Sequence, residues 1–308
     1  MATTPRAPAE PIIYVNGGFV PQSEARISVL DHAVLYGDGV FDTVVAWNDA
    51  IFELDAHIDR FYRSLKAIAL ECPVSRAELV ELLCGAVRRN QLSNAYIKWI
   101  VTRGSNGTPL MDPAGCVPNL IILVLPYVRR FDDARLARGL KLKTAAIRRP
   151  PGQVLDPHVK SLNYLNLVMA KLEAKAAGAD EALLLDMNGR LCEAPGYNVF
   201  VVQGRKLRTP AHDILEGVTR AVVMSLAQDS GLEVEACDLE LYDAYTSDEL
   251  MLCSTAGGIL PAVAIDGRRI GAGEPGPVFR ALDKGYQALL ASGARSTPIV
   301  NPTTSGRH

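Results

Sequence analysis

The order of the predicted strands and helices limits this chain to a few folds. Apolar runs rich in β-branched residues predict hairpins over residues 12–20 and 40–54, and two longer strands over 95–103 and 120–127. Predicted helices and further strands are mixed between and after them, without the regular β-α alternation of a doubly wound sheet. We therefore expect an α+β fold.

The predicted helices of the first half have recognisable starts. Asp55 is expected to cap a helix that runs to residue 69, and Ser75 with Glu78 three residues later forms a capping box for a helix over 75–90. The segment 104–118 carries three Gly and three Pro, so it is expected to be a long loop that could cover a substrate site.

The chain is long enough for two domains. Its 308 residues exceed the usual single-domain size, and the segment 127–139 is rich in arginine but poor in apolar residues. We expect this segment to be a linker between a small N-terminal α+β domain, residues 1–126, and a larger C-terminal domain, residues 140–308.

The second half alternates irregularly between strands and helices. Strands are expected over 140–147, 182–186, 199–202 and 250–253, and helices over 162–177, 219–230 and 276–290. The first of these helices carries apolar residues at helical spacing, among them Leu165, Val168 and Leu172, and it ends at Gly178.

Composition excludes several classes of protein. The net charge of −2 gives no basic excess for nucleic acid. The six cysteines form no C-x-x-C pair and no H-E-x-x-H occurs, so no metal site is expected. The first ten residues lack a signal-peptide core and no apolar run is long enough to cross a bilayer. The expectation is a cytoplasmic protein with reduced thiols and no membrane partner.

Two familiar motifs are incomplete. Gly37-x-Gly39 starts like a dinucleotide fingerprint, but Asp42 stands at the position of the third glycine and no P-loop occurs. The G-x-S-x-G motif of α/β-hydrolases is also missing. Nucleotide binding and serine hydrolysis therefore have little support.

Several residues far apart in the sequence could together supply an amine, a carboxylate and a binding site for an anion. Lys160 stands just before a predicted helix, where its amine could face a cleft, although such a lysine alone is more often a surface charge. Glu193 is a single carboxylate among small and apolar residues. The segments 215–220 and 254–258 are turns whose N–H and hydroxyl groups suit a phosphate, although ordinary helix caps look the same.

The residues resemble the class IV aminotransferases, the fold-type IV pyridoxal phosphate (PLP) enzymes. The similarity runs from about Ile13 to about Leu290, and seven stretches in the same order carry it. These stretches are 36–41, 57–64, 160–165, 180–186, 193–200, 217–220 and 254–261.

The resemblance implies a PLP cofactor and a role for each matched residue. Lys160 would form the Schiff base with the cofactor and move the proton between the substrate carbon and the cofactor. Glu193 would meet the pyridine nitrogen, and Tyr164 the phenolic oxygen. The phosphate would be held by Arg60 and by groups of the two turns. Those turn residues are Gly217, Val218, Thr219, Ser254 and Thr255.

Substrate-binding positions match two subfamilies in part. Tyr96 and Lys98 stand where branched-chain enzymes have a tyrosine and an arginine, while Phe41 and Trp99 would supply apolar walls. Ala256 is a further expected substrate-binding residue. Arg103, the other candidate for the carboxylate, is followed by Gly104 and Ser105, so the arginine and histidine trap of D-amino acid enzymes is not matched. Segments 254–261 and 274–278 are more similar to (R)-selective amine transaminases.

The resemblance as a whole predicts a transaminase that works by ping-pong half-reactions. The donor is expected to be an (R)-amine or a branched-chain type amino acid, and the acceptor a 2-oxo acid such as pyruvate or 2-oxoglutarate. A D-amino acid transaminase, an aminodeoxychorismate-type lyase and a non-catalytic protein remain the alternatives. The family also implies a homodimer.

Overall fold

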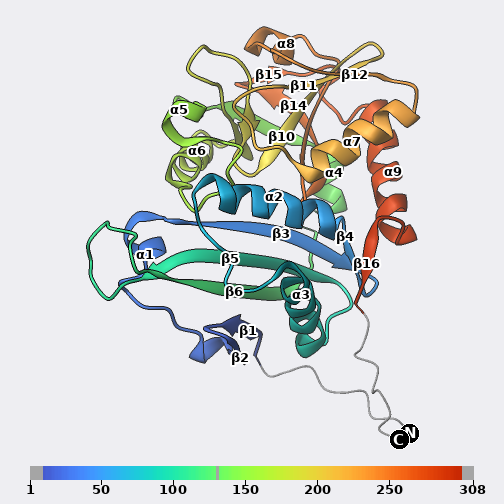
Figure 1. Cartoon of the computed structure of the whole chain (residues 1–308). Helices are drawn as coiled ribbons and strands as arrows, with labels where there is room; N and C mark the ends of the chain where they lie inside the picture. Colours follow the sequence, from blue (N-terminus) through green and yellow to red (C-terminus); the bar gives the residue numbers. More distant parts are fainter. Residues whose placement is uncertain (1–9, 130–131, 300–308) are drawn as a thin grey trace, which may run out of the picture. The chain divides into compact units, whose positions relative to one another are not determined.

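The computed structural model describes residues 10–129 and 132–299, which form two compact units (Figure 1). Residues 10–128 and 290–299 form the first unit, and the described part of 129–289 forms the second. Helix α4 (Asp133–Arg138) lies inside the segment expected to be a linker. The domain limits stay a prediction, and they differ from these units at the C-terminal end.

The first unit is built on an antiparallel sheet of seven strands among its described residues. Their order across the sheet is β16-β4-β3-β5-β6-β1-β2. The strands are β1 (Ile12–Val15), β2 (Gly18–Pro21), β3 (Gly39–Trp47), β4 (Ala50–Phe52), β5 (Ala95–Ser105), β6 (Val117–Pro126) and β16 (Ser296–Pro298). Both predicted hairpins are present, and the turn of the first has Asn16 and Gly17 at positive φ.

Two longer helices pack on this sheet. Helix α2 (Leu54–Ala67) runs along β3, and α3 (Arg76–Asn90) packs against β6 and β1 (Figure 1). The short elements η1 (Gln22–Glu24) and α1 (His32–Tyr36) connect β2 to β3. The capping box of Ser75 and Glu78 is confirmed, but Glu53 rather than Asp55 is the N-cap of α2.

Strand β5 separates two sets of side chains. Residues 95, 97, 99 and 101 are buried, whereas Tyr96 and Lys98 are half-buried on the opposite face. Trp99 packs edge-on against Phe61 of α2, with ring centroids 5.7 Å apart. The expectation that Trp99 supplies an apolar wall of the substrate site is therefore wrong, because strand alternation directs its indole into the core of the first unit.

The second unit contains a mixed nine-stranded sheet. The main path is β12-β11-β10-β13-β14-β7-β8, with β15 on β14 and β9 on β10. The strands are β7 (Leu140–Thr144), β8 (Glu181–Leu183), β9 (Glu193–Ala194), β10 (Tyr197–Gln203), β11 (Lys206–Pro210), β12 (Glu233–Cys237), β13 (Glu249–Ser254), β14 (Gly258–Ile265) and β15 (Arg268–Arg269). Parallel pairs occur only at β11–β12, β14–β7 and β7–β8 within the described chain, which confirms the α+β class.

Helices flank this sheet. Helix α6 (Leu165–Ala176) packs on β8 and β7, and α7 (Val218–Asp229) packs on β12 and β13. The remaining helices are α5 (Gly152–Leu155), α8 (Leu241–Tyr245) and α9 (Pro277–Ser292). Helix α6 begins three residues later than predicted, because residues 160–164 form tight turns.

The apolar stripe predicted for α6 faces outward. Leu165, Val168 and Leu172 are 74%, 50% and 54% exposed. The buried face instead carries Leu167, Ala170 and Ala174, which pack against the apolar side chains of β8 and its neighbours. Small residues let the helix approach the strands closely.

Three further observations concern the described residues alone. None of their helices is long and apolar enough to cross a membrane. No group of three or more metal-ligating side chains gathers among them. All six cysteines lie in the described ranges, and each is a free thiol.

Candidate active site

Lys160 and Glu193 belong to the same unit and interact electrostatically. Lys160 is half-buried in the irregular segment between α5 and α6, where Ser161 and Tyr164 donate backbone N–H groups to carbonyls two residues earlier. The charge of Lys160 is one of the influences that lower the pKa of Glu193. The two residues that carried the sequence prediction are thus close enough to affect each other.

Glu193 is a buried carboxylate with two partners. It is 5% exposed; its Oε1 lies 2.7 Å from Nε of Arg149, and its Oε2 accepts a hydrogen bond from the Leu215 amide at 3.0 Å. Burial raises the pKa of Glu193, while Arg149 and the Leu215 amide act in the opposite direction. Arg149 is itself 6% exposed, so both members of this pair are buried.

Asn198 ties the segments around Glu193 together. Its backbone pairs with Glu193 on β9 and with Cys253 on β13. Its side-chain amide donates to the carbonyl of Leu215 at 2.9 Å. The carboxylate, the turn before α7 and the end of β13 are therefore positioned through one residue.

The turn before α7 has a glycine at the N-terminal end of the helix, where the helix dipole favours an anion. Gly217 is the N-cap, so α7 begins one residue before the predicted start at Thr219, and Thr219 lies buried in the first turn. A Cβ at Gly217 would lie 1.9 Å from Oδ1 of Asn198. Only glycine lets the chain pass Asn198 here, and the positive end of a twelve-residue helix follows directly.

A second turn follows β13. Ser254, Thr255 and Ala256 are half-buried, and Oγ of Ser254 accepts the backbone N–H of Gly257 at 3.0 Å. Because Cys253 is the β-sheet neighbour of Asn198, this turn and the Gly217 turn flank the same strand, β10. The structure thus brings Glu193 and the two turns together around β10, whereas Tyr164 packs against the apolar cluster under α6.

The remaining predicted cofactor residue, Arg60, lies in the first unit. Arg60 is 4% exposed on α2, and it forms two hydrogen bonds with Asp42 of β3, at 3.0 Å from Nε and 2.7 Å from Nη2. His57, one turn earlier on α2, places Nδ1 2.8 Å from the same carboxylate.

The predicted substrate residues of the first unit share one face of its sheet. Tyr96 and Lys98 of β5 lie opposite Val45 and Thr43 of β3, and Nζ of Lys98 sits 4.2 Å from the ring centre of Phe41. Burial lowers the pKa of Lys98. Ala256, the fourth predicted substrate residue, is in the second unit.

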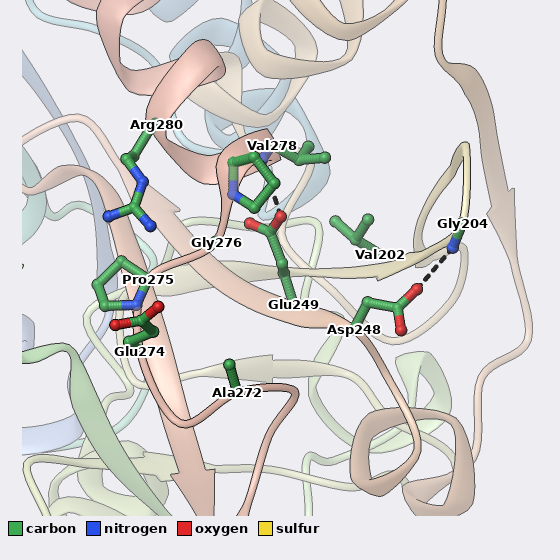
Figure 2. A pocket seen from close by; sticks show the side chains of 11 residues that line it. Val202, Gly204, Asp248, Glu249, Ala272, Glu274, Pro275, Gly276, Val278 and Arg280 are labelled. Atoms are coloured by element: carbon green, nitrogen blue, oxygen red, sulfur yellow. Dashed lines mark hydrogen bonds between the residues drawn. The ribbon is translucent and has the colours of Figure 1, made fainter.

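The segment 274–278, which resembles (R)-amine transaminases, has a structural role. The buried carboxylate of Glu249 accepts a hydrogen bond from the backbone of Val278 at the start of α9, at 2.8 Å (Figure 2). It accepts a second one from the backbone of Phe279, also at 2.8 Å. Gly276 has no room for a Cβ beside this carboxylate. The segment therefore leads into a capped helix at the edge of a cavity of about 280 Å³, and the close approach of Glu249 accounts for the glycine at position 276.

Sequence reasoning missed Arg149, Asn198 and Asp42. Asn198 left a signal, because asparagine is rare inside an apolar strand such as β10. Asp42 left a similar one in the apolar strand β3. Arg149 follows Arg148 and precedes two prolines, and nothing in that pattern distinguishes the buried Arg149 from the half-buried Arg148.

Sequence comparison agrees with this arrangement. A family model described as "Amino-transferase class IV" matches residues 39–265. A Methanocaldococcus jannaschii protein named "Putative branched-chain-amino-acid aminotransferase" is 41% identical over 280 residues, 90% of this chain and 96% of that protein. The branched-chain-amino-acid aminotransferase of Pseudomonas aeruginosa is 34% identical over 286 residues, 91% and 93% of the two chains. The chain belongs to the class IV aminotransferases.

Solved structures give the same result for the fold. A branched-chain amino acid aminotransferase from T.th., solved with pyridoxamine 5'-phosphate, has a TM-score of 0.91 at 33% identity, covering 94% of this chain and 99% of that chain. The Escherichia coli branched-chain enzyme has a TM-score of 0.90 at 27% identity, covering 94% and 100%. The fold-type IV architecture and the family are both confirmed.

Proposed function

We propose that this chain is a PLP-dependent transaminase that moves an amino group from a branched-chain type amino acid to a 2-oxo acid. The observation that carries the proposal is the buried carboxylate of Glu193, which Arg149 and the Leu215 amide hold beside Lys160 in the second unit. The similar structure from T.th. was solved with pyridoxamine 5'-phosphate, which supports the cofactor.

The residues present fit that cofactor. A pyridinium N–H needs a carboxylate acceptor, and Glu193 is a buried one with lone pairs beyond its two partners. A phosphate needs N–H donors and close backbone approach, which the Gly217 turn and the Ser254 turn provide. When bound, PLP supplies an aldehyde that condenses with amines and a ring that withdraws electrons from the substrate carbon.

The site side chains would then have the following roles. Lys160 holds the cofactor through Nζ and afterwards carries the proton between the substrate α-carbon and cofactor C4′. Glu193 keeps the pyridine nitrogen protonated, which strengthens electron withdrawal during proton removal. Tyr164 donates its hydroxyl proton to the phenolic oxygen, while Val218, Thr219, Ser254 and Thr255 bind the phosphate together with Arg60.

The donor class follows from two observations. The relatives at 41% and 34% identity both carry branched-chain names, and part of the segment 274–278 has a structural role at the cap of α9. Phe41 would offer an apolar wall for the donor side chain, and the ammonium of Lys98 would bind the carboxylate. We therefore rank a branched-chain donor above an (R)-amine.

One experiment tests the assignment directly. Borohydride reduction followed by peptide mapping should find the pyridoxyl group on Lys160, and a label on Lys171 or another lysine would overturn it. A donor panel with both enantiomers of each compound, run with pyruvate and with 2-oxoglutarate, then identifies the substrate. Transfer from (R)-amines or D-amino acids alone would replace the donor assignment, and pyruvate release without an amino acceptor would indicate a lyase.

We also propose a cytoplasmic homodimer. Helix α6 exposes four apolar side chains at i, i+3, i+4 and i+7, which is the pattern of a helix that packs on another surface. These residues are Leu165, Val168, Met169 and Leu172. Light scattering after gel filtration should give twice the 33.2 kDa chain mass, and a monomer at micromolar concentration would contradict the dimer.

A further inference from the structure

Asp42, His57 and Arg60 form a buried network within the first unit. Asp42 is 0% exposed, His57 2% and Arg60 4%. Burial alone would raise the pKa of Asp42, but the charges and hydrogen bonds of Arg60 and His57 hold it well below the ordinary value. An ionised carboxylate only accepts, so Nδ1 of His57, at 2.8 Å, carries the proton that it donates to Asp42.

The contact with Asp42 fixes how Arg60 presents its guanidinium. The Nε and Nη2 edge is used in the paired contact with the carboxylate. A paired contact of this kind fixes the plane of the guanidinium, whereas a single hydrogen bond leaves it free to rotate.

We infer that Asp42 is a positioning residue for the cofactor phosphate, because it holds the Arg60 guanidinium in the orientation that the phosphate requires. The inference rests on the proposed function, in which Arg60 binds the phosphate. The reason is entropic: a long arginine side chain loses rotamer freedom when it binds an anion, and a partner that has already fixed it removes that cost from binding.

If Asp42 had a different role, its replacement would change PLP affinity in the opposite direction. A buried carboxylate near a phosphate repels it, so a residue that only neutralised Arg60 for folding would weaken phosphate binding. Replacement by asparagine would then strengthen PLP binding. Positioning predicts that the same replacement weakens it.

The experiment compares PLP with pyridoxal, which has the same ring and aldehyde but no phosphate. Dissociation constants of both are measured on full-length apoenzyme by cofactor absorbance. Arg60→Ala should raise the constant for PLP by at least about tenfold and leave that for pyridoxal within about twofold. Asp42→Asn should give the same selective loss, about fivefold or more. When Asp42→Asn is combined with Arg60→Ala, the dissociation constant for PLP should be the same as in Arg60→Ala alone, since Asp42 acts through Arg60.

Asp31→Asn is the matched control. Asp31 is also 0% exposed in the first unit, but its carboxylate accepts from Thr102, Asn119 and the Ala33 amide rather than from an arginine. Its replacement should change both dissociation constants equally or not at all. An equal loss of PLP and pyridoxal in Asp42→Asn, no loss, or tighter PLP binding would overturn the positioning role.

Two further outcomes are separated by the design. If Arg60→Ala leaves the preference for PLP unchanged, the phosphate role of Arg60 in the proposed function fails; if only Asp42→Asn does so, the positioning role fails alone. If Asp42→Asn does not fold, His57→Gln is the substitute variant. It removes the His57 Nδ1 group that donates to Asp42, and it keeps an amide close to the position of the His57 Nε2 atom. It should lower PLP affinity about two- to threefold without affecting pyridoxal, and an equal effect on both ligands would overturn the inference.

Discussion

Nε of Arg149 lies 2.7 Å from Oε1 of Glu193, and both side chains are buried. Removing one partner of a buried ion pair leaves an uncompensated charge, which costs about 3–5 kcal/mol unless the remaining group is neutralised. A carboxylate can be neutralised by taking up a proton. Arg149 therefore helps to decide whether Glu193 is an anion.

The first prediction concerns Arg149→Met. Burial raises the pKa of Glu193 and Arg149 lowers it, so the variant should raise it further. A protonated Glu193 cannot accept the pyridine proton, and turnover should fall by about tenfold or more at neutral pH. The turnover of the variant should recover partly at higher pH, as measured by a pH profile of kcat. An unchanged profile would mean that Arg149 does not control Glu193.

The second prediction concerns Glu193→Gln, which removes the charge but keeps the shape. Turnover should fall by at least ~10²-fold, the scale of losing a key electrostatic group, while the cofactor stays bound. Steady-state kinetics with cofactor content measured by absorbance separate the two effects. Turnover at the wild-type level would assign the electron-withdrawing role to another group.

The same variant gives a pH prediction for the apoenzyme. A carboxyl with a raised pKa in the folded state binds its proton more tightly there than in the unfolded chain, so its contribution falls as pH rises above the ordinary value of 4.5. Glu193→Gln should remove that fall, and the variant should gain stability relative to wild type as the pH is raised from about 4.5 to neutral. Urea unfolding at both pH values measures the difference, and a constant difference would contradict it.

The third prediction concerns Gly217→Ala. The new Cβ would lie 1.9 Å from Oδ1 of Asn198, whose amide holds the turn that also contacts Glu193. PLP affinity should fall by about tenfold or more, because either the turn or Asn198 must move. Gly285→Ala in α9 is the control, since its Cβ meets only Leu226 at 3.6 Å, and alanine should stabilise the helix by up to about 1 kcal/mol. Similar PLP affinity in both variants would rule out the close approach at Gly217.

Local sequence signals predicted most elements of the fold. The capping box of Ser75 and the turn at residues 16–17 depend on neighbours in sequence, and both are present. The spacing of apolar residues predicted the wrong buried face for α6. Spacing identifies an apolar face of a helix, but it does not say which face the rest of the unit covers. It also could not predict β16, whose three residues owe their strand to pairing with β4, distant in sequence.

The candidate site shows the same division. Lys160, Glu193 and the two turns stand in motifs, so resemblance located them. Arg149 and Asp42 act through partners brought close by the fold, 44 and 18 residues away in sequence. A charge near an apolar strand indicates that a partner exists, but a single sequence does not identify it.

The last prediction concerns Lys98, whose ammonium lies 4.2 Å from the ring centre of Phe41 on the face that also carries Tyr96. If it binds the substrate carboxylate, Lys98→Ala should raise KM for amino acids and oxo acids by roughly tenfold, the effect of losing a charged hydrogen bond of about 1.5–3 kcal/mol. Amines without a carboxylate should be affected little in their own half-reaction. Lys141→Ala, an exposed strand lysine of β7, is the control and should change neither KM.

The pH dependence of the same constant provides an independent check. Burial lowers the pKa of Lys98, so the ammonium loses its proton at a lower pH than the ordinary value of 10.5. KM for carboxylate substrates should therefore begin to rise at moderately alkaline pH, and Lys98→Arg should move that rise upward because guanidinium stays charged. KM profiles for an amino acid and for a simple amine, measured on both proteins, distinguish this from a general alkaline loss. Equal losses for the two donors in Lys98→Ala, or an alkaline rise that Arg leaves unmoved, would show that Lys98 does not bind the carboxylate.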